Sequence, residues 1–281
     1  MSSKKTKTIH HQPESQRIRG FGWKPDLPDV RDHYFAVLPK TMQKLPPKVD
    51  LRPKCPPVYD QGQIGSCTAN AIAGAVEFER RKAGQKPAFT PSRLFIYYNE
   101  RAIEGDTGND AGAAIRNGIK SVNKQGVCTE KLWTYDDTPA TTDGGPWPAG
   151  AKPAQKPPKA CYDAALHYQA IQYQRVMPML SQMKGCLAEG NPFVFGFTVY
   201  ASLYDGNGAP RKAVPMPTAT DKLLGGHAVL AVGYDDAAQQ FIVRNSWGPH
   251  NQDKGYFYMP YSYLTETNLA DDFWVIKLIE D

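Results

Sequence analysis

A cysteine stands where a glycine-rich turn gives way to an alanine-rich segment, in the stretch QGQIGSCTANAIAG (61–74). Ser66 is a candidate N-cap, and the apolar spacing predicts a buried helix over 66–83, stopped by Gly84. Cys67 is therefore expected at a helix N-terminus, where unpaired N–H groups and the helix dipole lower the pKa of a thiol. A lone cysteine in such a place is more often a core residue. A nucleophile would also need a base, an orienting group and oxyanion donors.

The candidate base is His227, in the stretch LLGGHAVLAVGYDD. Two glycines precede it and a predicted buried strand follows it. Asn245 ends the next predicted strand, and antiparallel pairing of the two strands places His227 near residue 246. The Asn245 carbonyl would then accept from one imidazole nitrogen and leave the other for the thiol. Trp247 would cover that hydrogen bond and exclude water.

The candidate oxyanion donor is Gln61, six residues before the cysteine. Its amide and the backbone N–H of Cys67 can both donate to a developing oxyanion. Each residue taken alone has an ordinary structural explanation, as a strand histidine, a turn asparagine, a core tryptophan or a surface glutamine. Together they occur in the order that one mechanism requires, which favours nucleophilic catalysis by the thiol.

The elements that must position these residues change character along the chain. The first part is helical, with Thr90 as a candidate N-cap and Pro91 as a first helical residue, and period-two strands dominate the second. The predicted helices cover 66–83, 90–103, 112–125 and about 176–189. The predicted strands cover 193–200, 227–236, 241–247, 255–261 and 273–279. Helices followed by strands predict an α+β fold with two lobes and a cleft between them.

Length and composition exclude several classes of protein. With 281 residues and 41% hydrophobic residues the chain can bury a core. No apolar stretch is long enough to span a membrane and the N-terminus lacks an apolar h-region, so we expect a cytoplasmic protein or one exported by a non-Sec route. The five cysteines are widely spaced, which predicts neither a disulfide framework nor a zinc finger. They are Cys55, Cys67, Cys128, Cys161 and Cys186.

The net charge of +5 is carried by the N-terminal arm, because the first 50 residues hold ten Lys and Arg against five Asp and Glu. A basic arm can bind nucleic acid or an anionic membrane. This one lacks the interleaved aromatic residues of a nucleic-acid platform, so a solvated extension is the favoured interpretation and no specific nucleic acid partner is expected.

Three stretches, VDLRP…VYDQGQIGSCTANA, GGHAVLAVGY and NSWG…GYF, resemble the papain-like cysteine peptidases over about residues 45–281. The resemblance implies a helical left lobe whose central helix is headed by Cys67, an antiparallel β-rich right lobe and an active-site cleft between them. It implies Cys67 as nucleophile, His227 as base, Asn245 as orienting residue and Gln61 as oxyanion residue. It also implies polypeptide substrates and no metal or organic cofactor, and we expect a monomer.

The resemblance extends to residues that would contact substrate. GNDAGAAIRNGI is similar to the segment in which the family carries a cleft-lining glycine pair, with Ala111 and Gly112 standing in its place. Gly226 precedes the candidate base in a glycine doublet similar to that of cathepsin-B-like sequences. Gly65, Ser66 and Trp247 complete the expected substrate-binding set.

The chain departs from the family pattern at three places. Ile64 replaces a disulfide cysteine, which fits a reducing compartment or a bacterial branch. Thr68 replaces the usual tryptophan after the nucleophile, and the segment HNQDK after Trp247 and its glycine lacks a second tryptophan.

Residues 1–45 occupy the place of a pro-segment. They contain the pattern PDxPDxRD and resemble the short arms of the xylellain-like bacterial branch of the family. We expect the aromatic section 21–35 to lie over or near the active site, so that the chain is an autoinhibited zymogen. The peptidase domain is then 46–281. Its parts are a helical lobe at about 55–135, a proline-rich loop at 136–160 and a β-rich lobe at about 161–281.

The leading hypothesis is a cysteine endopeptidase that works through a thioester acyl-enzyme. An acyl transferase or peptide ligase would use the same Cys-His-Asn site with an amine in place of water. A catalytically silent peptide-binding protein of papain fold is the alternative from another class, favoured by Thr68, Ala111 and the missing tryptophan.

Overall fold

The computed structural model describes residues 21–168 and 171–278. The α-helices are α1 (Pro39–Gln43), α2 (Cys67–Lys82), α3 (Arg93–Glu104), α4 (Ile115–Gln125), α5 (Lys159–Ala165), α6 (Leu180–Ala188) and α7 (Tyr261–Thr265). The strands are β1 (Trp23–Lys24), β2 (Lys48–Asp50), β3 (Ala113–Ala114), β4 (Ile171–Arg175), β5 (Phe193–Tyr200), β6 (Leu223–Asp235), β7 (Gln240–Arg244), β8 (Tyr256–Pro260) and β9 (Ala270–Leu278).

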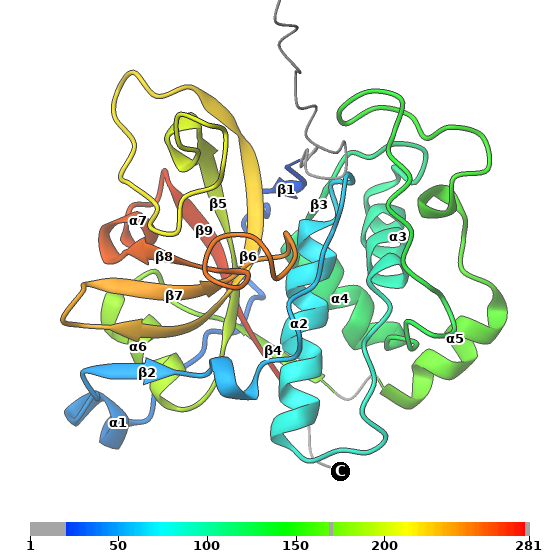
Figure 1. The fold of residues 1–281 in the computed structure, drawn as a ribbon. Coiled ribbons are helices and arrows are strands. Elements are labelled where there is room, and N and C mark those ends of the chain that lie inside the picture. The colour runs from blue at the N-terminus through cyan, green and yellow to red at the C-terminus, as the bar shows by residue number, and fades with distance from the viewer. Residues whose placement is uncertain (1–20, 169–170, 279–281) are drawn as a thin grey trace, which may run out of the picture.

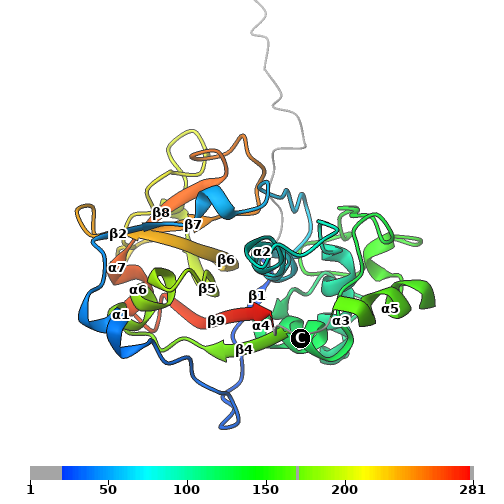
Figure 2. The same ribbon diagram turned by 90° about the horizontal axis from the view of Figure 1, so that it is seen from below.

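α2 lies between the large sheet and the helices α3, α4 and α5. In Figure 1 the helices α3, α4 and α5 stand to the right of α2 and the large sheet to its left, and Figure 2 shows α2 end-on between them. The sequence of α2 suits this central place because its first fourteen residues are all buried and many are alanine or glycine. At Gly74 an added Cβ would lie 3.3 Å from the Arg244 side chain, so a small residue lets the helix approach the sheet closely.

Seven strands of the described residues form one sheet in the order β4-β9-β5-β6-β7-β8, with β2 paired to β6. Its pairings are antiparallel, so consecutive strands return beside one another. The long strand β6 is buried from His227 to Tyr234 between its neighbours and α2. The hairpin from β6 to β7 contains a register shift at Val232, which places Leu230 opposite Arg244. This hairpin carries the two predicted residues His227 and Asn245 to one end of the sheet.

A second, two-stranded sheet joins the N-terminal arm to the helical side. β1 pairs in parallel with β3, with Trp23 opposite Ala113. Figures 1 and 2 show β1 running between the large sheet and the helices. The arm then continues along the molecule to α1 and enters the core with Phe35 and Val37.

The predicted helices and strands occur in the predicted order, with differences at their ends. α3 begins at Arg93, and its N-cap is Ser92, whose hydroxyl accepts from the Phe95 N–H at 3.2 Å; Thr90 and Pro91 lie before the helix. α6 begins only at Leu180, because Pro178 favours extended backbone in the residue before it. None of the helices in the described ranges combines the length and apolar character needed to cross a bilayer.

Candidate active site

Cys67 is the first residue of α2 and is fully buried. Ser66 precedes the helix, but its side chain makes no capping hydrogen bond. Its hydroxyl instead lies 2.6 Å from the hydroxyl of Tyr135 and accepts from the Asn70 amide at 3.0 Å. The free amide groups of the helix N-terminus are therefore left to the thiol and its surroundings.

His227 and Asn245 are hydrogen bonded, with 2.9 Å between imidazole Nε2 and the amide Oδ1. The other ring nitrogen, Nδ1, is buried and has no hydrogen-bond partner among the described residues. Trp247 stacks on the imidazole with ring centroids 4.9 Å apart and covers it as expected. Because Oδ1 of Asn245 accepts, Nε2 carries the proton and Nδ1 is left as an acceptor.

Gln61 is brought to this site by pairing with the strand end that carries Asn245. The Gln61 backbone N–H donates to the Ser246 carbonyl at 2.8 Å, and the Ser246 hydroxyl donates to the Gln61 side-chain oxygen at 2.7 Å. The side-chain Nε2 of Gln61 donates one hydrogen to the Ile64 carbonyl at 3.0 Å. Since the serine holds the oxygen, the amide nitrogen is the group that faces the turn before Cys67.

The charged forms of the thiol and the imidazole are both disfavoured in this state. Burial raises the pKa of Cys67 to about 12, although the backbone N–H groups of Ala228, Gly22 and Thr68 favour the thiolate. Burial lowers the pKa of His227 to about 4. The lowered pKa that the helix N-terminus alone would give Cys67 is therefore not reached, because desolvation outweighs the N–H groups.

The N-terminal arm is one of the segments that bury the site. The Phe21 ring lies edge-on to the His227 ring at 6.2 Å between centroids, and Gly22 contributes an N–H to the Cys67 sulfur. Gly22 is packed so closely that an added Cβ would lie 1.7 Å from the Gly65 carbonyl oxygen. Of the section 21–35, Phe21 and Gly22 thus contact the residues around the thiol and the imidazole.

Trp23 packs against glycines of the neighbouring strands β5 and β6. An added Cβ at Gly196 would lie 2.0 Å from the Trp23 ring, and one at Gly226 would lie 2.6 Å from the Trp23 carbonyl oxygen. The indole N–H donates to the buried Asp272 carboxylate at 3.0 Å. The two glycines therefore form flat walls against which a planar side chain packs.

The residues expected to contact substrate divide into two groups. Gly65, Gly112 and Gly226 each lie against the arm. Gly112 has φ +66°, and an added Cβ there would lie 2.1 Å from the Gly22 carbonyl oxygen. Ala111 is half-buried beside Gly112, whereas the Ser66 side chain points to Tyr135 and away from the arm.

Three supporting residues were not found from the sequence. The Asp110 carboxylate accepts from the Gly65 N–H at 3.0 Å and from the Tyr97 hydroxyl, so it fixes the turn before Cys67. Gln252 accepts from the Asn245 amide at 2.8 Å. The third is Ser246. Its position inside the motif NSWG, next to Asn245, is the feature of the sequence from which its place at the site could have been predicted.

Thr68, one of the departures from the family pattern, is also part of this surrounding. Its hydroxyl donates to Glu100 at 2.6 Å, and Glu100 is fully buried on α3. Burial raises the pKa of Glu100 to about 8, and its negative charge raises that of Cys67. A protonated Glu100 removes that unfavourable charge from behind the thiol.

All five cysteines lie in the described residues and are free thiols. Within residues 21–168 and 171–278 no group of three or more His, Cys, Asp or Glu side chains is arranged to hold a metal ion.

The chain was compared with known families and proteins. Residues 45–275 match the model of the papain family of cysteine proteases. An uncharacterized peptidase C1-like protein of Acanthamoeba polyphaga mimivirus is 39% identical over 287 residues, covering 94% of this chain and 88% of the viral protein.

Solved structures give the same picture. Xylellain, a cysteine protease from Xylella fastidiosa, is 50% identical with a TM-score of 0.89, covering 97% of this chain and all of xylellain. A procathepsin B from Trypanosoma congolense is 16% identical with a TM-score of 0.65, covering 96% of this chain and 89% of the other, which is a likeness of fold alone. These likenesses confirm the predicted α+β fold of two lobes and the predicted resemblance to xylellain-like proteins.

Proposed function

The chain belongs to the papain family of cysteine proteases, and from that premise we propose that it is an endopeptidase whose nucleophile is Cys67 and whose N-terminal arm keeps it inactive. The observation that carries the proposal is the imidazole of His227, which Asn245 holds through one nitrogen while the other stays unpartnered in a buried site. Buried polar atoms in proteins are usually hydrogen bonded, so an unsatisfied imidazole nitrogen favours a chemical role for His227 over a purely structural one.

In the proposed reaction the thiol proton passes to His227 Nδ1 and the Cys67 sulfur bonds to the carbonyl carbon of a peptide. The bond to the leaving amine breaks as the imidazolium returns the proton to that amine. Water, deprotonated by the same imidazole, then attacks the thioester and releases the acid and the free thiol. Gln61 Nε2 and the Cys67 N–H are the proposed donors to the oxyanion of both steps.

The arm is proposed to hold this pair in its neutral form. It removes water from the thiol and imidazole, and desolvation opposes the thiolate and the imidazolium alike. When the arm leaves, water returns, the two pKa values move toward each other and the reactive ion pair becomes accessible. Residues 1–45 are the proposed pro-segment and residues 46–281 the proposed peptidase domain.

Gly22 offers a test that leaves the body of the protein unchanged. In Gly22→Ala the new Cβ overlaps the Gly65 carbonyl, so the arm must move out of the cleft. We expect the full-length variant to hydrolyse a quenched fluorescent peptide at least tenfold faster than the wild type, and Gly22→Ala with Cys67→Ala to be inactive. Gly206→Ala is the matched control, because its Cβ would meet nothing within 4 Å. A folded Gly22→Ala variant without hydrolysis would contradict the proposal.

A further inference from the structure

Beyond the cleft, the side chains of Asp26 and Asp32 on the arm are bound by Arg116 of α4, Arg175 of β4 and Trp274 of β9. The Asp32 carboxylate accepts from the Arg116 guanidinium at 2.5 Å and from Arg175 Nε at 3.0 Å. The Asp26 carboxylate accepts from the Trp274 indole N–H at 2.8 Å. Both carboxylates belong to the PDxPDxRD pattern of the arm.

The Asp26 carboxylate has further partners. The backbone N–H of Arg116 donates to it at 3.1 Å, and Arg175 lies 3.3 Å away. The buried Asp272 also faces this place and shares Arg175 at 2.9 Å. The guanidinium carbons of Arg116 and Arg175 lie 5.6 and 4.9 Å from the centroid of the Trp274 ring, so the indole helps to position both cations.

Within the PDxPDxRD pattern, residues 25–32, the burial of side chains is the reverse of ordinary apolar docking. The Asp26 side chain is fully buried and that of Asp32 is 7% exposed. Leu27 is 81% exposed and Val30 is fully exposed. The body thus takes up the carboxyl groups of this segment and leaves its apolar side chains in solvent. Burial and the neighbouring Asp272 raise the pKa of Asp26 to about 7, so hydrogen bonds hold Asp26 and ion pairs hold Asp32.

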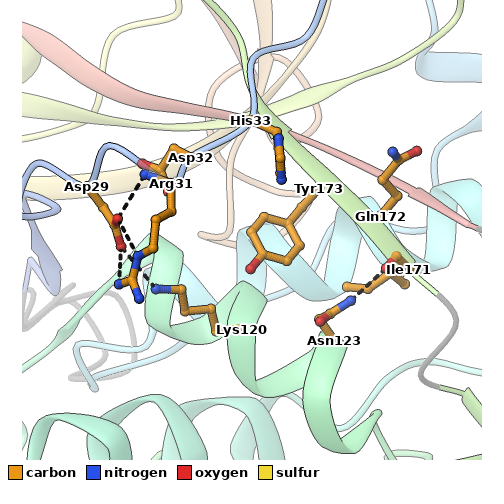
Figure 3. Close-up of a pocket in the computed structure, with 9 residues that line it drawn as sticks. All are labelled: Asp29, Arg31, Asp32, His33, Lys120, Asn123, Ile171, Gln172 and Tyr173. Atoms are coloured by element: carbon orange, nitrogen blue, oxygen red, sulfur yellow. Dashed lines mark hydrogen bonds and ion pairs between the residues drawn. The ribbon is translucent and has the colours of Figure 1, made fainter.

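Packing of the outer arm against the body is also incomplete. A cavity of about 550 Å³ lies between the arm, where Asp29 and Arg31 to His33 line it, and the elements α4 and β4. Figure 3 shows the His33 and Tyr173 side chains directed at it. Asp29 pairs chiefly with Arg31 within the arm, and Lys120 of α4 approaches it only to 3.7 Å. Shape complementarity contributes little here. The outer arm is attached by the Asp26 and Asp32 side chains and by backbone hydrogen bonds of His33 and Phe35 with Arg175, each of 2.8 Å.

Departure of the arm leaves donors without acceptors. Within the described residues the Arg116 guanidinium has the Asp32 carboxylate and the Leu27 carbonyl as its acceptors, both on the arm. Arg175, in contrast, keeps Asp272. A half-buried guanidinium without an acceptor is unfavourable. The surface around Arg116 therefore favours binding of another carboxylate once the arm has left.

We propose that Arg116, Arg175 and Trp274 form a docking surface for acidic peptide segments, which the arm occupies in the resting protein. When the arm leaves, as the proposed function requires, a polypeptide with two carboxyl side chains six positions apart occupies the same surface. Such a polypeptide is held beside the cleft by residues that take no part in the chemistry.

The test uses a full-length chain whose own arm is disabled by Gly22→Ala, Asp26→Asn and Asp32→Asn. The probes are two fluorescein-labelled peptides with the sequence of residues 24–35, one with both aspartates and one with asparagine at those two places. Binding is followed by fluorescence anisotropy at low salt, and folding of each protein by circular dichroism. We expect the aspartate peptide to bind at least tenfold more tightly, with the difference shrinking as salt rises.

Body variants then locate the surface. Adding Arg116→Gln is expected to remove the tenfold difference, whereas Lys120→Gln, a neighbouring cation outside the surface, is expected to keep it. Equal binding of the two peptides, no binding of either, or a difference that persists in Arg116→Gln would overturn the inference. Because anisotropy needs no hydrolysis, a chain that binds the aspartate peptide but cleaves nothing would contradict the proposed function and leave the docking surface standing.

Discussion

The backbone of Gly22 presents its N–H to the Cys67 sulfur, while its carbonyl oxygen accepts from the Ala113 N–H at 2.7 Å. A thiolate needs the carbonyl carbon of a peptide bond in reach and its oxygen in the oxyanion site. In this arrangement the Gly22 N–H faces the nucleophile, and the Gly22 carbonyl oxygen is bound by Ala113 rather than by the proposed oxyanion donors. The arm therefore covers the site in an orientation that is unsuited to cleavage.

We accordingly predict that the chain does not cut its own arm next to Gly22. Purified wild-type protein incubated under conditions in which Gly22→Ala hydrolyses peptides should keep its intact mass across the bond from Gly22 to Trp23. A fragment beginning at Trp23 that accumulates independently of protein concentration would show that the arm binds in a cleavable orientation. Cys67→Ala, incubated in parallel, separates this from contaminating proteases.

Replacing Asn245 by alanine should slow the reaction without displacing substrate. The variant loses the acceptor that fixes the His227 ring at 2.9 Å, so the imidazole samples unproductive orientations. We expect kcat, measured in the Gly22→Ala background, to fall by about 10- to 100-fold with KM little changed, a part of the 10²–10⁴-fold that general acid–base catalysis supplies. Asn207→Ala, on an exposed loop, serves as control. An unchanged kcat would mean that packing by Trp247 is sufficient to orient the His227 ring.

Ser246 should act through Gln61. Gln61→Ala removes the proposed oxyanion donor and is expected to lower kcat by about 10²–10³-fold. Ser246→Ala leaves the amide in place but frees it to rotate, because its oxygen loses the hydroxyl donor at 2.7 Å. We expect a smaller loss, and no additional loss when Ser246→Ala is added to Gln61→Ala. Additive losses in kcat would assign Ser246 a role apart from Gln61.

Glu100 should make stability depend on pH. Burial raises its folded pKa to about 8, above the usual 4.5 of a glutamate, so the protonated form contributes stability in full below pH 4.5. That contribution is lost as pH rises through 8. Glu100→Gln lacks this titration. The variant should therefore gain stability relative to the wild type between pH 5 and 8, by on the order of a few kcal/mol. Urea unfolding of both proteins at the two pH values measures the difference, and a constant difference would contradict the buried, protonated carboxyl.

The local patterns around the candidate site were sufficient to predict its main elements. The alanine-rich run after Cys67 predicted α2, and the hairpin between two apolar strands predicted that His227 and Asn245 meet. The register differs from the predicted one by two residues beside the turn and by one residue beyond the shift at Val232, which no local pattern indicates. Neighbouring strands tolerate such a shift, so the two side chains still form their hydrogen bond.

Contacts between distant parts of the chain were not predictable in the same way. Asp32 meets Arg116 and Arg175, which lie 84 and 143 residues further along. Asp110 reaches the Gly65 N–H across 45 residues. Such pairs depend on how the helices and the sheet pack, and neither residue's neighbours in the sequence carry that information. The raised pKa of Cys67 has the same origin, because it depends on burial of the thiol in the packed protein.

The most direct test of the central claim, an activated Cys67 covered by the arm, is intact-mass analysis after reaction with an epoxysuccinyl inactivator. Wild type, Gly22→Ala, and Gly22→Ala with Cys67→Ala would be compared over time. The account predicts a single adduct that forms fast in Gly22→Ala, slowly in the wild type and not at all without Cys67. Equal rates in the first two proteins, or no adduct in a folded Gly22→Ala, would contradict it.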